Sequence, residues 1–209
     1  MKTRIFAIMA TLAVVLLSAC QPPPQPGTID ILGDSLTVQA TWDHNAEFDA
    51  RGRPPDSDVV LDAWGGFQFQ DVQQRQGERV ASGRPEIMVI VLGTNNAEAW
   101  TGHWQQNDVD AYVQLLNTPH SDTCVVVVLP GFSYKPTLTA ADHTSVDAAR
   151  RHMTTYAEQR PNTIIADWGS VARSRPELTD YDGVHLANTT AARNAYADVI
   201  WGGVNSCPS

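Results

Sequence analysis

Apolar runs alternate with segments of helical spacing along most of the chain. Five apolar runs predict strands, at about residues 28–32, 57–63, 86–92, 123–129 and 162–167. The segments between and after them predict helices, at about 35–42, 69–82, 106–117, 142–159 and 188–201. Two of the strand runs, 87–92 and 124–129, are continuously apolar, which is typical of strands buried on both faces. The pattern predicts one α/β domain, a three-layer α/β/α sandwich with a central, mostly parallel five-stranded sheet.

Three short polar blocks stand out against this pattern. The first predicted strand is followed by Gly33-Asp34-Ser35-Leu36, and the third is followed by Gly93-Thr94-Asn95-Asn96. Near the C-terminus, Asp182 stands three residues before His185. Parallel strands place their carboxyl ends at one edge of the sheet, where ligands usually bind, so the first two blocks are expected to meet. Taken alone, the first block would also fit an ordinary helix N-cap, because Asp and Ser are common there.

In order and spacing, the three blocks resemble the SGNH (GDSL-type) hydrolase family, over nearly all of the chain after its N-terminal segment. The resemblance implies an SGNH, flavodoxin-like fold and a serine esterase. It implies that Ser35 is the nucleophile and that Asp182 and His185 form the dyad that activates it. It also implies that the side chain of Asn95, together with the backbone N–H of Ser35 and of a glycine, forms the oxyanion hole.

Two parts of this match are looser than the rest. The glycine block corresponds to the end of the second predicted strand, where Gly65 and Gly66 both fit, and Gly66 is the preferred assignment. After Asn95, the family's usual aspartate is replaced by Asn96. We expect this replacement to change the hydrogen bonds that orient Asn95, and therefore the rate or specificity rather than the type of reaction.

The residue types fit acyl transfer without a cofactor. A serine hydroxyl is a poor nucleophile until a neutral imidazole accepts its proton, and a carboxylate fixes the tautomer of that imidazole. The oxyanion that forms needs preorganised hydrogen-bond donors. No metal is expected, because the six histidines show neither the HExxH pattern nor the paired-cysteine spacing of zinc sites.

The N-terminus has the pattern of an export signal. Lys2 and Arg4 precede an apolar segment at 5–19, which is short for a membrane-spanning helix. Leu17-Ser18-Ala19-Cys20 resembles a bacterial lipobox, which implies cleavage before Cys20 and acylation of its thiol; an ordinary signal peptide with an incidental cysteine is the alternative. We expect an exported protein that is lipid-anchored to the bacterial cell membrane, with a signal peptide at 1–19, the lipidated cysteine and a stiff proline-rich tether at 20–27, and the hydrolase domain at 28–209.

The net charge limits the kinds of binding partner, and the cysteine content predicts a disulfide. The chain carries a formal net charge of −9, and removal of residues 1–19 would take away only positive charges. Nucleic acids and anionic polymers are therefore disfavoured, and a neutral or cationic substrate is expected. With Cys20 acylated, Cys124 and Cys207 remain, and export favours one disulfide between them over two separate thiols.

Tryptophans after the predicted strands are the best guide to the substrate. Trp64 stands beside the glycine block, and Trp100 and Trp104 follow Asn95. Their indoles could stack on sugar rings or hold an acyl chain, but any one of them could equally cap the core. The segment 130–134 predicts another pocket wall. A glycan ester, a lipid ester and acyl transfer to a glycan hydroxyl all stay open, as does the oligomeric state; a catalytically weak glycan-binding protein is the rival class.

Overall fold

A five-stranded sheet forms the centre of the computed structural model, which describes residues 24–72 and 82–208. The strands lie in the order β2-β1-β3-β4-β5, and each adjacent pair is parallel. The predicted fold class is confirmed, and the sheet is parallel throughout. The bounds are β1 (Gln25–Gly33), β2 (Asp58–Ala63), β3 (Pro85–Val91), β4 (Cys124–Val128) and β5 (Thr163–Ala166).

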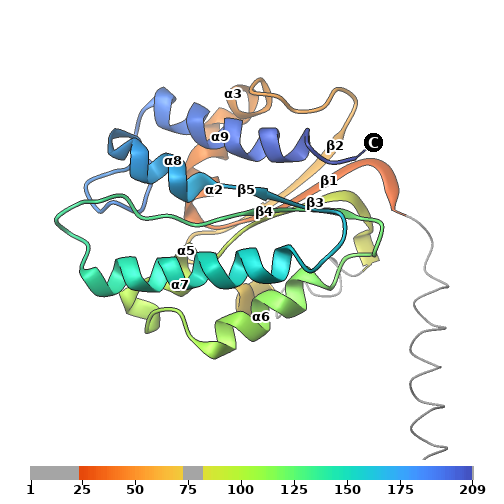
Figure 1. The fold of residues 1–209 in the computed structure, drawn as a ribbon. Coiled ribbons are helices and arrows are strands. Elements are labelled where there is room, and N and C mark those ends of the chain that lie inside the picture. The colour runs from red at the N-terminus through yellow and green to blue at the C-terminus, as the bar shows by residue number, and fades with distance from the viewer. Residues whose placement is uncertain (1–23, 73–81, 209) are drawn as a thin grey trace, which may run out of the picture.

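Helices cover both faces of the sheet (Figure 1). One face carries α2 (Ser35–Thr41), α3 (Asn45–Asp49), α8 (Trp168–Ser174) and α9 (Thr190–Val204). The other face carries α5 (Thr94–Ala97), α6 (Gln106–Leu116) and α7 (Ala140–Ala157). Three 3-10 turns join them: η1 (Trp42–His44), η2 (Ala99–Thr101) and η3 (Pro176–Leu178).

The pattern of apolar residues predicted α2, α6, α7 and α9 but missed α3, α5 and α8. In helices of four to seven residues, an apolar repeat hardly stands out against the flanking loops. The helix predicted over 69–82 begins at Phe69, and residues 73–81 lie outside the described part of the chain.

The core has two halves, one on each side of the sheet. In β4, Val126 and Val128 pack into the half beneath α2, α8 and α9, whereas Val125 and Val127 pack into the half beneath α6 and α7. This alternation explains the continuously apolar run, because successive side chains of a central strand face opposite layers. The edge strand β2 differs: its Leu61 is 37% exposed.

The two ends of the described chain are tied to the sheet. Strand β1 begins inside the expected tether, since Gln25 pairs with Pro85 of β3, so the folded domain starts before residue 28. The predicted disulfide is confirmed: Cys124 at the start of β4 is bonded to Cys207 after α9, with their Cα atoms 6.0 Å apart. Within residues 24–72 and 82–208, no helix is long and apolar enough to cross a membrane. The expected signal segment and Cys20 lie outside the described residues.

Candidate active site

Ser35 stands where β1 gives way to α2, at the carboxyl edge of the sheet. Asp34 is the N-cap of this helix, and its Oδ1 accepts a hydrogen bond of 3.0 Å from the backbone N–H of Leu36. A Cβ at Gly33 would lie 2.4 Å from Oγ1 of Thr37, so the close approach of strand and helix requires glycine. The block therefore is a helix cap, but the capping group is Asp34, and Ser35 is left to face the sheet edge.

A line of hydrogen bonds joins the serine to the C-terminal block. Oγ of Ser35 lies 3.0 Å from Nε2 of His185, and Nδ1 of His185 lies 2.7 Å from Oδ2 of Asp182. The other carboxylate oxygen, Oδ1, accepts the backbone N–H groups of Val184 and His185 at 2.9 Å and 3.0 Å. With Nδ1 protonated toward the carboxylate, Nε2 is free to accept the serine proton.

Two carboxyl groups of the site have shifted pKa values in opposite directions. Partial burial acts to raise the pKa of Asp182, but hydrogen bonds from Val184 and His185 outweigh it and hold the pKa below its usual range. Asp182 is therefore ionised at neutral pH and can orient the imidazole. Asp34 is 1% exposed, and burial raises its pKa to about 7. A carboxyl group that titrates near neutral pH thus directly precedes the nucleophile.

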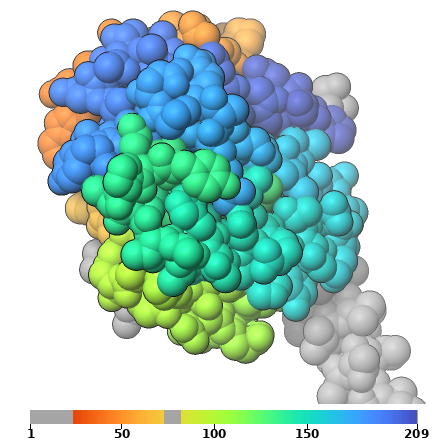
Figure 2. All heavy atoms as spheres, turned by 60° about the vertical axis from the view of Figure 1, so that its left-hand side comes forward, coloured from red at the N-terminus to blue at the C-terminus, as the bar shows by residue number. Residues whose placement is uncertain are grey.

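The segment after β4 supports the loop that carries the dyad. The backbone N–H of Ser133 donates to the carbonyl of Gly183 at 2.8 Å, and its hydroxyl lies 2.5 Å from Oγ1 of Thr179. Figure 2 shows the exposed chain that follows this segment, in green, against the blue C-terminal part of the chain. Within the predicted pocket wall at 130–134, Phe132 and Ser133 are fully buried and therefore do not line a pocket, whereas Tyr134 is 68% exposed.

A second support comes from the nucleophile's own helix. The side-chain Oε1 of Gln39 in α2 accepts the backbone N–H of Leu186 at 3.0 Å, so the helix that begins with Ser35 also holds the residue after His185. Sequence reasoning missed Gln39 and Ser133. Neither residue type carries a motif, and both contacts depend on segments brought together only in the fold.

Asn95 is tied to the loop that contains Gly66, the two residues predicted to form the oxyanion hole with Ser35. Gly66 has a φ of +81°, in a turn that the N–H of Phe67 closes onto the carbonyl of Trp64 at 3.3 Å. This left-handed conformation favours glycine at 66, and Gly65 does not share it. Nδ2 of Asn95 donates to the carbonyl of Phe67 at 2.8 Å and so ties the two loops together. An amide nitrogen has a second hydrogen, which leaves one for an oxyanion.

Asn96 has a structural role that the sequence did not reveal. It is fully buried, its Nδ2 donates to Oδ1 of Asp108 at 2.8 Å and to Oε1 of Gln70 at 3.0 Å, and its Oδ1 accepts the N–H of Phe69 at 3.3 Å. Oδ2 of Asp108, in turn, caps α6 by accepting the N–H of Gln105 at 2.7 Å. The carboxylate of this buried network therefore comes from Asp108, and Asn96 supplies the donor.

The three tryptophans named from the sequence have different environments. Trp104 packs on the core: its Nε1 donates to Nδ1 of His152 at 2.8 Å, and its ring lies edge-on to Phe69 at 6.0 Å. Trp64 and Trp100 are 57% and 62% exposed. Only these two are open to a ligand.

Taken together, the groups suit acyl transfer from an ester. A hydroxyl is paired with an imidazole, the imidazole with an ionised carboxylate, and an amide donor lies beside a glycine turn. Among residues 24–72 and 82–208, no three His, Cys, Asp or Glu side chains gather closely enough to hold a metal ion.

Comparisons with known proteins agree with this geometry. The profile of the GDSL-like lipase/acylhydrolase family matches residues 31–193. A comparison with curated protein sequences gives no match.

Solved structures with the same fold act on different substrates according to their names. The catalytic domain of the Streptococcus pneumoniae peptidoglycan O-acetyltransferase A is 22% identical, with a TM-score of 0.62 over 87% of this chain and 91% of that one. An acetyl xylan esterase is 16% identical, with a TM-score of 0.65 over 85% and 99%. A lipase/acylhydrolase from Enterococcus faecalis is 16% identical, with a TM-score of 0.64 over 85% and 94%.

Proposed function

The chain belongs to the GDSL-like lipase/acylhydrolase family, and from that premise we propose that it cleaves or transfers a small acyl group through an acyl-Ser35 intermediate. The observation that carries the proposal is the unbroken line of hydrogen bonds from Asp182 through His185 to Ser35. A glycan-binding protein without catalysis would not need this alignment.

In the first half of the reaction, Oγ of Ser35 attacks the ester carbonyl carbon while Nε2 of His185 accepts the hydroxyl proton. The ionised Asp182 stabilises the imidazolium through Nδ1. The carbonyl oxygen becomes an oxyanion, for which Asn95 and the N–H groups of Ser35 and Gly66 are the donors. When the bond to the leaving alcohol breaks, His185 returns the proton to the alcohol, and the acyl group stays on Ser35.

In the second half, an acceptor hydroxyl attacks the acyl-serine and gives its proton to His185. The bond to Oγ breaks, and Ser35 recovers the proton. Water as acceptor gives hydrolysis, whereas a sugar hydroxyl gives O-acyl transfer. Incubation with an acetyl ester and a neutral oligosaccharide, followed by mass spectrometry, distinguishes them: free acetate alone indicates an esterase, and acetylated oligosaccharide indicates a transferase.

Covalent labelling tests the proposed nucleophile. A fluorophosphonate probe should label the wild-type protein once, and Ser35→Ala should remove the label. Ser57→Ala is the matched control, because Ser57 is a buried serine whose hydroxyl contacts Pro54 and Arg53 and not the dyad loop. Labelling of Ser35→Ala to the same extent as the wild type would contradict the assignment.

The proposed location is the outer side of the cytoplasmic membrane or another envelope membrane, with the domain anchored through acylated Cys20. The lipobox-like Leu17-Ser18-Ala19-Cys20, the prolines that follow and the disulfide support export. Stable anchoring needs more than one acyl chain. The wild type should therefore fractionate with membranes and Cys20→Ser should not. Recovery of the wild type with an unmodified N-terminus in the soluble envelope fraction would contradict the anchor.

A further inference from the structure

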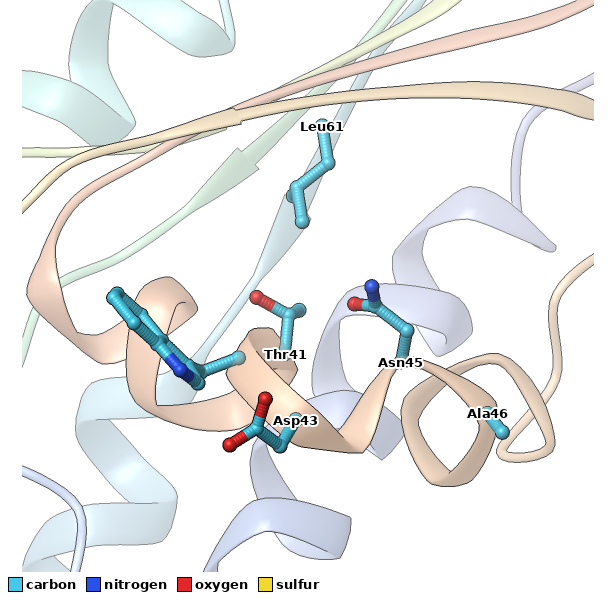
Figure 3. A pocket seen from close by; sticks show the side chains of 6 residues that line it. Thr41, Asp43, Asn45, Ala46 and Leu61 are labelled. Atoms are coloured by element: carbon cyan, nitrogen blue, oxygen red, sulfur yellow. The ribbon is translucent and has the colours of Figure 1, made fainter.

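A groove runs along the edge of the sheet beside the candidate active site; its first part is lined mainly by apolar side chains and its second part by apolar and polar ones. Its first part, about 360 Å³, lies between α2 and β2 and is bordered by Val38 and Trp64. Its second part, about 570 Å³, lies between β2 and the segment 41–46. Figure 3 shows Leu61 of β2 pointing toward Thr41 in this second part. Trp42 and Leu61 line both parts, which makes the groove continuous.

The groove approaches the catalytic groups along the elements that carry them, although Ser35, Gly66 and His185 do not themselves line it. Val38 lies one helical turn after Ser35 and therefore on the same side of α2. Trp64 and Gly65, which also line the groove, directly precede Gly66 of the oxyanion turn. A group attached to the reacting ester at Ser35 can therefore extend into the groove along the protein surface.

Two indoles are exposed along this groove. Trp42 is 71% exposed and Trp64 is 57% exposed. The Trp64 indole is nevertheless held in place, because its Nε1 donates to Oδ1 of Asp62 at 3.1 Å and its ring lies 6.2 Å from that of Phe67. A side chain that is fixed before binding loses less conformational entropy when a ligand arrives. Large aromatic faces that are ordered yet open to water are suited to stacking on a flat ligand.

The polar lining distinguishes a sugar from an acyl chain. Thr41, Asp43 and Asn45 line the second part and offer hydroxyl, carboxylate and amide groups to hydroxyls of a ligand. A long acyl chain would gain little there, since its apolar surface would lie against these polar groups and water. The carboxylate of Asp43 disfavours an anionic occupant.

We propose that this groove binds the neutral glycan chain of a sugar ester, with Trp42 and Trp64 stacking on sugar rings while the acyl group reaches Ser35. The inference rests on the proposed esterase function, whose substrate class it names. It makes Trp42 and Trp64 determinants of specificity that do not touch the reacting atoms.

The test compares Trp42→Ala and Trp64→Ala with Trp100→Ala. Trp100 is the comparison because it is 62% exposed and follows Asn95 but does not line the groove; a fall in the ratio in Trp100→Ala and not in the groove variants would place the sugar rings at Trp100 and overturn the proposal. The substrates are acetylated xylohexaose and 4-nitrophenyl acetate. The ratio of kcat/KM for the oligosaccharide to that for the small ester should fall about tenfold in each groove variant, mainly through KM, and stay unchanged in Trp100→Ala.

Calorimetry with unesterified xylohexaose and N-acetylchitohexaose separates this inference from the proposed reaction, because it needs no turnover. The wild type and Trp100→Ala should bind at least one of the two, and the groove variants should bind about tenfold more weakly. If the wild type cleaves 4-nitrophenyl acetate but binds neither oligosaccharide, and the groove variants leave the ratio of kcat/KM values unchanged, the glycan groove is overturned. The proposed esterase activity would still stand. A selective loss of activity toward 4-nitrophenyl octanoate in the groove variants would overturn it in favour of an acyl-chain groove.

Discussion

Nε2 of His185 lies 3.0 Å from Oγ of Ser35, although 150 positions separate the two residues in the chain. Strand β1 and helix α2 place the serine, and the short loop after η3 places the imidazole. Gln39 and Ser133 each donate or accept a hydrogen bond that helps to hold that loop at the sheet edge.

Replacing His185 tests this contact directly. His185→Ala should lower kcat for 4-nitrophenyl acetate nearly as far as Ser35→Ala, by roughly a thousandfold or more, because residues that act as one unit are not additive. The measurement is steady-state kinetics of both single variants and of the double variant. A double variant much slower than either single variant would show that the two residues act independently.

Asn95 is expected to act mainly in the transition state. Asn95→Ala removes the amide that we assign to the oxyanion and should lower kcat by roughly a hundredfold or more, with little change in KM. Because Asn95 also donates to the carbonyl of Phe67, a thermal melt must accompany the kinetics. An effect confined to KM would reassign Asn95 to substrate binding.

The buried contact between Asn96 and Asp108 can be tested by exchanging the amide and the carboxylate. Asn96→Asp restores the residue more usual in the family, but here it would place a second carboxylate against Oδ1 of Asp108, 2.8 Å from the present amide. We expect it to destabilise the fold by roughly 1–3 kcal/mol, because a buried donor is replaced by a repelling charge. Urea denaturation of Asn96→Asp, Asp108→Asn and the double variant checks this.

In the double variant the carboxylate and the amide exchange places, so most of the lost stability should return. If the double variant loses as much free energy of unfolding as the two single variants together, the contact between residues 96 and 108 is energetically unimportant.

The raised pKa of Asp34 predicts a pH-dependent stability. Burial raises this pKa from 3.8 to about 7, so the folded protein keeps a proton that the unfolded chain releases between these pH values. The contribution of Asp34 to the free energy of unfolding therefore falls as pH rises through that window. Asp34→Asn keeps the oxygen that accepts from Leu36 but does not titrate.

Its stability relative to the wild type should thus improve between pH 4.5 and pH 7.5, by roughly 3 kcal/mol. Denaturation curves at the two pH values measure the difference. The same relative stability at both would mean that Asp34 is ionised in the folded protein throughout.

The disulfide between Cys124 and Cys207 closes a long stretch of chain, from β4 to the C-terminus. Removing it in the double variant Cys124→Ala/Cys207→Ala should lower the free energy of unfolding by roughly 2–4 kcal/mol, because the unfolded chain gains conformational freedom. Thiol titration of the exported wild type provides the control. Two reactive thiols in the denatured, unreduced protein would contradict the bond.

The sequence by itself determined the alternation of strands and helices along the chain and the burial of β3 and β4. It also identified the polar blocks that contain Ser35, Asn95 and His185. These features are local: an apolar run, a turn glycine and short motif spacing are visible without knowing what lies opposite. The backbone distinguishes the two candidate glycines, since only Gly66 of the pair has a positive φ, +81°; its role as oxyanion donor stays a prediction.

Only the tertiary structure decided which segments meet. The partners of Asn96, the support from Gln39 and Ser133, and the groove between Trp42 and Trp64 join residues far apart in sequence or on separate elements. The exposure of Leu61 likewise depends on β2 being an edge strand, which its apolar run does not reveal. Side-chain contacts of this kind carry no sequence period, because they are set by how strands and helices pack, and so they could not be predicted from the chain alone.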